Sequence, residues 1–115
     1  MPTVREILPH DAAARLLEYR RAVMRAVPEV ERLVLFGSRA RGDARDDSDY
    51  DVAVFVRNLP NRRLVRRLLS DLAYDHILEG FFIRPIALPS QALAAQSVWP
   101  SELAEDIARE GVEIA

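Results

Sequence analysis

The chain has 115 residues, a formal net charge of −2 and no cysteine. Its length predicts a single domain over residues 1–115, and its small negative charge argues against direct nucleic-acid binding. Disulfides, thiolate zinc sites and cysteine nucleophiles are excluded, and because all sixteen basic residues are arginine, so are a Walker-type lysine and a Schiff-base lysine.

The first half of the chain predicts a helix followed by two buried strands. Apolar residues recur at helical spacing over residues 8–27, and Pro28 ends this helix. The continuous apolar run 33–36 predicts a strand that ends at Gly37, and the run 52–56 predicts a second strand.

The second half predicts alternating helices and strands. The expected segments are a helix over 62–78 with Leu64 in its buried stripe, an edge strand over 81–88 that contains Pro85, a short helix over 90–95, a helix over 101–110 and a strand over 112–114. Trp99, between the last two helices, is interpreted as an apolar lid on the core. This order favours an α/β fold in which helices cover mainly one face of a small mixed sheet.

The segment after the first strand is suited to binding phosphate. Ser38 is placed to cap a helical turn over residues 39–41, and Gly42 can close that turn in a left-handed conformation. Free backbone N–H groups at a helix start, next to Gly37, favour an anion. We therefore expect phosphate at this loop.

A pair of carboxylates opens the second strand. Asp49 and Asp51 are two residues apart, so at strand spacing their side chains share one face. Two adjacent carboxylates repel each other, and a divalent cation that prefers oxygen ligands relieves the repulsion. Mg²⁺ fits this arrangement best. A short return joins the phosphate loop to the strand that carries the aspartates, so the loop and the metal could act on one nucleoside triphosphate.

The segment from Gly37 to Asp51 resembles the signature of the DNA polymerase beta superfamily, in its minimal, single-domain nucleotidyltransferase (MNT) branch. The shared pattern is Gly37-Ser38, ten residues, then Asp49-x-Asp51. The resemblance implies the nucleotidyltransferase fold, with Gly37 and Ser38 holding the β- and γ-phosphates of ATP and Asp49 and Asp51 as the catalytic, Mg²⁺-binding pair. An acceptor hydroxyl would attack the α-phosphate and pyrophosphate would leave.

Two groups of arginines are candidate ligands on chemical grounds. Guanidinium groups match phosphate oxygens, which makes Arg39 and Arg41 plausible phosphate clamps. The first turns of the helix over 62–78 carry four cations at the positive end of the helix dipole, which is locally unfavourable and typical of a binding surface. We predict that this face meets a partner or the acceptor, with a merely solvated face as the alternative; its residues are Arg62, Arg63, Arg66 and Arg67.

The chain departs from the family at one position. Catalytic members usually carry a third carboxylate on the strand after the central helix, whereas residues 81–88 contain no acid and their charged residue is Arg84. Asp75 and Glu79 are the nearest acids in the sequence. A slow transferase is therefore expected, because losing a positioned base costs about 10²–10⁴-fold in rate.

The resemblance also implies a partner and a biological role. Members of this branch are typically antitoxins encoded beside a HEPN-domain toxin, and some transfer AMP to a tyrosine of that toxin. Two alternatives stay open: a non-catalytic module that neutralises its partner by binding, and a transferase acting on a small-molecule hydroxyl. With no basic-then-apolar leader and no apolar stretch of about 20 residues, a cytoplasmic location is expected.

Overall fold

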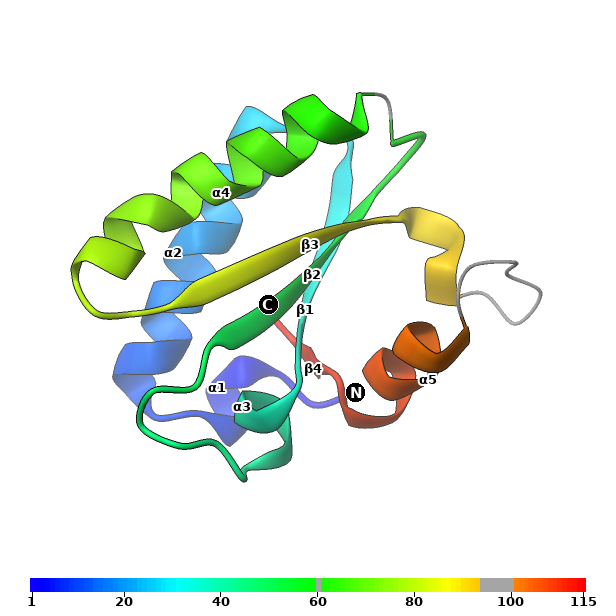
Figure 1. Cartoon of the computed structure of the whole chain (residues 1–115). Coiled ribbons are helices and arrows are strands. Elements are labelled where there is room, and N and C mark those ends of the chain that lie inside the picture. The colour runs from blue at the N-terminus through cyan, green and yellow to red at the C-terminus, as the bar shows by residue number, and fades with distance from the viewer. Residues whose placement is uncertain (60, 94–100) are drawn as a thin grey trace.

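The computed structural model describes residues 1–59, 61–93 and 101–115, which contain a four-stranded mixed sheet (Figure 1). The strands are β1 (Val30–Phe36), β2 (Tyr50–Val56), β3 (Ile83–Pro89) and β4 (Val112–Glu113), in the spatial order β3-β2-β1-β4. β1 is antiparallel to both β2 and β4, and β2 is parallel to β3. The expected small mixed sheet is confirmed.

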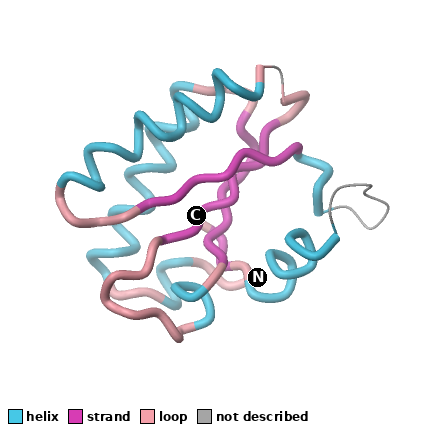
Figure 2. Tube along the Cα trace, viewed as in Figure 1, coloured by secondary structure: helices cyan, strands magenta, loops and turns pink. Residues whose placement is uncertain are grey.

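Helices lie on both faces of the sheet but cover one face more fully (Figures 1 and 2). Side chains of alternate residues on β2 explain this, because Val52 and Val54 belong to the core under the long helices whereas Ala53 and Phe55 belong to a smaller core on the other face. The long helices are α2 (His10–Ala26) and α4 (Arg62–Leu78); the other face carries η1 (Ser90–Leu93) and α5 (Ser101–Glu110), and the remaining helices are the short α1 (Val4–Ile7) and α3 (Ser38–Arg41).

β3 is an edge strand, as its proline predicts. Pro85 has no backbone N–H and is therefore confined to positions where the ladder does not need one. The parallel register pairs Asp51 with Arg84 and Val52 with Pro85. This register places Arg84 directly beside the second aspartate of the predicted metal pair.

Two expectations about element boundaries and burial were wrong. β1 begins at Val30 rather than at residue 33. Arg32, in the part of β1 that was not predicted, forms a two-bond ion pair with Glu113 of the neighbouring strand β4 (3.2 and 2.8 Å). Leu64 is 52% exposed, because the buried stripe of α4 runs through Val65, and adjacent helical residues point about 100° apart.

Other expectations fall partly outside the described residues. Of the helix expected over 90–95, the structure describes the short η1, and the Trp99 lid lies outside the described residues. Within the ranges that the structure describes, the helices are too short or too polar for any of them to cross a bilayer.

Candidate active site

The phosphate loop predicted from the sequence is a tight glycine turn between β1 and α3. Gly37 has φ +77° and ψ −160°, and its carbonyl accepts hydrogen bonds from the N–H groups of Ala40 and Arg41, both at 3.0 Å. Gly37 therefore occupies the N-cap position, and the expected capping role of Ser38 was wrong, because Ser38 is the first residue of α3. Gly42 closes the turn at φ +86° as predicted.

Close packing against Asp51 explains why a glycine stands at position 37. The antiparallel register pairs Phe36 with Asp51, so the turn begins directly above this aspartate. A Cβ atom on Gly37 would lie 2.5 Å from Asp51 Oδ2, a separation that real side chains do not show. The predicted phosphate loop and the predicted metal pair thus form one continuous site.

The two aspartates converge on a single cation, the guanidinium of Arg84. Arg84 Nε donates to Asp51 Oδ1 at 2.7 Å, and its Nη1 lies 3.4 Å from Asp49 Oδ2. The hydrogen bond to Asp51 raises the pKa of Arg84 above its ordinary value. The Asp51 side chain is 14% exposed and that of Arg84 is 68% exposed, so the carboxylate is held in the site and its partner reaches solvent.

Arg84 also stands on the strand where the resemblance to the DNA polymerase beta superfamily implies a third carboxylate. The two acids nearest in sequence do not replace it. Glu79 forms an ion pair with Arg15 of α2 at 3.0 Å, which lowers the pKa of Glu79, and Asp75 lies on an exposed position of α4. Arginine has donors only, so Arg84 can neither accept a proton nor bind a cation.

Glu110, the last residue of α5, is a site residue that sequence reasoning missed. Its Oε1 accepts a hydrogen bond from the N–H of Gly37 at 3.0 Å, and both its oxygens lie 3.2 Å from Arg41 Nη1. Its side chain is only 11% exposed. A carboxylate at the negative end of a helix is locally unfavourable, and this was the signal in the sequence that could have identified it. Glu110 thus places an anion on a backbone N–H of the predicted phosphate loop.

The two candidate clamp arginines are held differently. Arg39 donates to the carbonyls of Ser48 (3.0 and 3.2 Å) and Asp46 (3.2 Å), and its guanidinium lies 4.5 Å from the centre of the Tyr50 ring. Arg39 therefore ties the return loop to the start of β2. Arg41 pairs with Asp43 and Glu110, which raise its pKa, and this keeps it beside the Gly37 turn.

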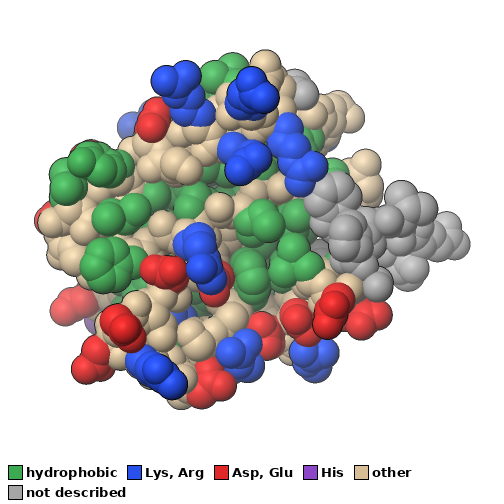
Figure 3. Space-filling view, in the orientation of Figure 1, with side chains coloured by type: hydrophobic (Ala, Val, Ile, Leu, Met, Phe, Trp, Pro, Cys, Tyr) green, Lys and Arg blue, Asp and Glu red, His purple; other side chains and the backbone are tan. Residues whose placement is uncertain are grey.

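A pocket of about 630 Å³ lies beside Asp51 and Arg84. Its polar lining includes Asp51, Arg84, Arg62 and Arg66, and its apolar lining includes Phe36. Figure 3 shows basic side chains gathered over the N-terminal part of α4, above an apolar area of the same face.

The predicted arginine face divides between two hollows. Arg62 and Arg66 reach the pocket beside Asp51, whereas Arg63 and Arg67 line a separate shallow hollow of about 390 Å³ together with Arg66. The structure therefore brings half of this face to the site and leaves the other half on the outer surface of α4.

The donor set fits Mg²⁺ bound together with a substrate. Asp49 and Asp51 present oxygens to one cation position, and Mg²⁺ is commonly held by one or two carboxylates plus substrate phosphates. Among the residues that the structure describes, no group of three or more His, Cys, Asp or Glu side chains could hold a metal. Further ligands would have to come from nucleotide or water.

A glycine turn beside two converging carboxylates, on a mixed sheet of this order, defines the class of nucleotidyltransferases. The polymerase beta nucleotidyltransferase family matches residues 21–114, and the chain belongs to this family. A relative in Methanocaldococcus jannaschii, named "Putative protein adenylyltransferase MJ1305", is 40% identical over 70 residues, which cover 59% of this chain and 48% of the relative. The chain spans about half the length of the relatives that it matches in this way.

Solved structures share the fold. A chain of a toxin–antitoxin complex with AMP-PNP aligns with a TM-score of 0.58 and 22% identity, over 86% of this chain and 72% of that one. A chain of a complex between the tri-AMPylated Shewanella oneidensis HEPN toxin and an MNT antitoxin aligns with a TM-score of 0.54 and 19% identity, over 90% of this chain and 71% of that one. The expected fold class is thereby confirmed.

Proposed function

We propose that this protein is a Mg²⁺-dependent adenylyltransferase that transfers AMP from ATP to a hydroxyl group of a partner protein. The observation that carries the proposal is the convergence of Asp49 and Asp51 on one cation position, in contact with the Gly37 turn. The relative named as a protein adenylyltransferase and the related fold crystallised with AMP-PNP support it.

In this proposal the chain holds ATP across the glycine turn. The N–H groups of Gly37 and the first turn of α3 would bind the β- and γ-phosphates, after Glu110 releases the N–H of Gly37. Asp49 and Asp51 would hold Mg²⁺, which when bound neutralises charge on the phosphates and on the leaving pyrophosphate. The acceptor oxygen forms a bond to the α-phosphorus, the bond to the β-phosphate oxygen breaks, and the hydroxyl proton passes to solvent.

The acceptor would enter from the pocket beside Arg84. Attacking and leaving oxygens lie roughly in line across the transferred phosphorus, so an acceptor approaches from the side opposite the pyrophosphate. The pocket lined by Phe36, Arg62 and Arg66 also includes Asp51, and we take it as the acceptor side. Its arginines suit a hydroxyl-bearing side chain on an acidic protein surface.

The proposed partner is a HEPN-domain toxin, the proposed acceptor is a tyrosine, and this chain would be the antitoxin. Support comes from the fold shared with an MNT antitoxin in complex with a tri-AMPylated HEPN toxin. The outward arginines of α4, Arg63 and Arg67, would extend the contact with an acidic partner surface.

One observation favours a second candidate function. Because Arg84 stands where a base would act, the protein could neutralise its partner by binding alone. The two functions are separated by incubating the protein with Mg²⁺, the product of the neighbouring reading frame and ATP labelled at either the α- or the γ-phosphate. Transfer of α-label but not γ-label, lost in Asp51→Asn, is expected. If the partner is neutralised but carries no label, the second function stands.

A further inference from the structure

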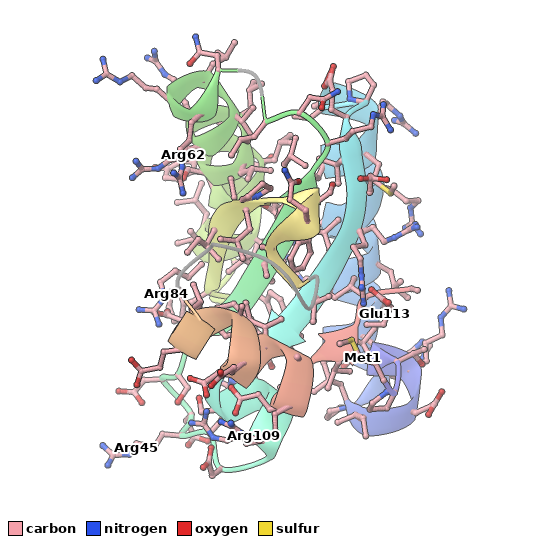
Figure 4. The ribbon with its side chains drawn as sticks, turned by 90° about the vertical axis from the view of Figure 1, so that its right-hand side faces the viewer. Met1, Arg45, Arg62, Arg84, Arg109 and Glu113 are labelled. Carbon is pink, nitrogen blue, oxygen red and sulfur yellow. The ribbon has the colours of Figure 1, made fainter. Side chains whose placement is uncertain are left out.

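Arg84 holds a position that a metal ion would need. Its Nε donates to Asp51 Oδ1 at 2.7 Å and its Nη1 lies 3.4 Å from Asp49 Oδ2, so one guanidinium neutralises part of the charge of both carboxylates. Figure 4 shows Arg84 on the side of the molecule opposite Glu113. A cation that binds between the aspartates must compete with this side chain.

We propose that Arg84 occupies the cation position between the two aspartates. The aspartate pair then binds a divalent metal efficiently only when a polyphosphate is present to accept hydrogen bonds from the displaced guanidinium. The inference rests on the proposed metal role of Asp49 and Asp51. Arg84 is thus a positioning residue that couples the binding of metal to the binding of nucleotide.

Electrostatics set the direction of this coupling. Two ionised carboxylates carry a charge of −2, which Arg84 reduces to −1, so a metal ion alone meets a weaker attraction and must also break a charge-assisted hydrogen bond. A triphosphate changes both conditions. Its oxygens are acceptors for the fork of guanidinium donors and contribute further ligands to the metal. Metal and nucleotide then strengthen each other by the same factor, as linkage requires.

The surroundings of Arg84 allow the exchange. The side chain is 68% exposed and stands on an edge strand, so it can leave the aspartates without burying its charge. It also lines the pocket of about 630 Å³ beside Asp51, which offers space for the displaced group.

A purely structural ion pair is the competing explanation, and the fold offers a matched example of one. Arg32 forms a two-bond pair with Glu113 on the β1–β4 side of the sheet, with one carboxylate instead of two. The β2–β3 ladder that Arg84 crosses already pairs seven residues in register, from Tyr50 with Ile83 to Val56 with Pro89. Its backbone bonds hold β3 in place without this side chain.

Two measurements on Arg84→Gln, with Arg32→Gln as the control for loss of one positive charge, test the inference. The first is Mn²⁺ affinity without nucleotide, from the free Mn²⁺ signal in electron paramagnetic resonance. The second is AMP-PNP affinity in EDTA, from calorimetry. We expect Arg84→Gln to bind Mn²⁺ about tenfold more tightly than wild type and metal-free AMP-PNP about threefold more weakly, each on the scale of one charge-assisted contact. Arg32→Gln should match wild type in both.

Changes of opposite sign in the two affinities would not result from a general loosening of the fold. Arg84→Lys keeps the charge and should retain most of the wild-type behaviour, which provides a second variant if the glutamine variant folds poorly. Equal Mn²⁺ affinity of wild type, Arg84→Gln and Arg84→Lys would overturn the role of Arg84 while leaving the metal site intact. Mn²⁺ binding that is undetectable in all three, with or without AMP-PNP, would overturn the inference together with the metal assignment.

Discussion

Replacing Gly37 by alanine should disrupt both the turn and the carboxylate below it. An alanine at φ +77°, ψ −160° occupies a backbone region almost exclusive to glycine, at a cost of about 1–3 kcal/mol. Its Cβ would also lie 2.5 Å from Asp51 Oδ2, so the carboxylate must shift, which disturbs its hydrogen bond to Arg84. Loss of that exposed ion pair adds at most about 1 kcal/mol. We expect a total near 3 kcal/mol, or about 12 °C in Tm for a domain of this size.

Gly42→Ala is the matched control. Gly42 also has a positive φ, +86°, but among the described atoms none lies within 4 Å of a Cβ built there. Strain alone should cost about 1 kcal/mol, or about 4 °C in Tm. Only Gly37→Ala should also remove Mg²⁺-dependent ATP binding in calorimetry.

A double-mutant cycle isolates the contact with Asp51. In the Asp51→Ala background the carboxylate is absent, so Gly37→Ala should cost about 1 kcal/mol less in chemical denaturation than it does in wild type. Equal Tm losses for the two glycine variants, or strict additivity of Gly37→Ala with Asp51→Ala, would refute the close approach on which the site depends.

Three further changes test separate parts of the site. Asp49→Asn and Asp51→Asn should each leave the fold intact and abolish the Mg²⁺ dependence of ATP affinity, measured by calorimetry with and without Mg²⁺. Equal ATP affinity of the wild type in both conditions would contradict the metal assignment. Glu110→Gln removes the anion from the Gly37 N–H and should tighten ATP binding by about threefold to tenfold, and unchanged affinity would show that Glu110 does not compete with phosphate. Charge reversal of Arg63 and Arg67 should slow association with an acidic partner and reduce its salt dependence, while Tm changes little; identical association rates across a salt series would return these arginines to a solvated surface.

Local patterns were sufficient to predict the turn and the strand that carry the candidate site. Gly37 ends an apolar run and Asp51 opens another, and short-range rules for turns and strands apply directly to both. Pro85 identified the edge strand because a missing N–H has the same consequence in any sheet. The mixed sheet and its long helices followed from the periodicity of apolar residues.

Long-range contacts could not be predicted in the same way. The bond between Gly37 and Glu110 spans 73 residues, and it depends on where α5 docks, which hydrophobic periodicity does not determine. Likewise, the sequence shows Arg84 on a strand, but only the parallel register of β2 and β3 places it against Asp51. The sequence indicated a missing base, whereas the structure shows a cation bound to the aspartate pair.

The central proposal, that this chain is an enzyme, is tested most directly by turnover on its partner. One equivalent of the protein is incubated with about ten equivalents of the neighbouring gene product, ATP and Mg²⁺, and the partner is followed by intact-mass spectrometry. The proposal predicts that all of the partner gains mass in steps of one AMP unit, with peptide mapping locating the added groups on a hydroxyl side chain. It also predicts that Asp51→Asn adds none. An unmodified partner that is neutralised only up to one equivalent of this protein would contradict the proposal.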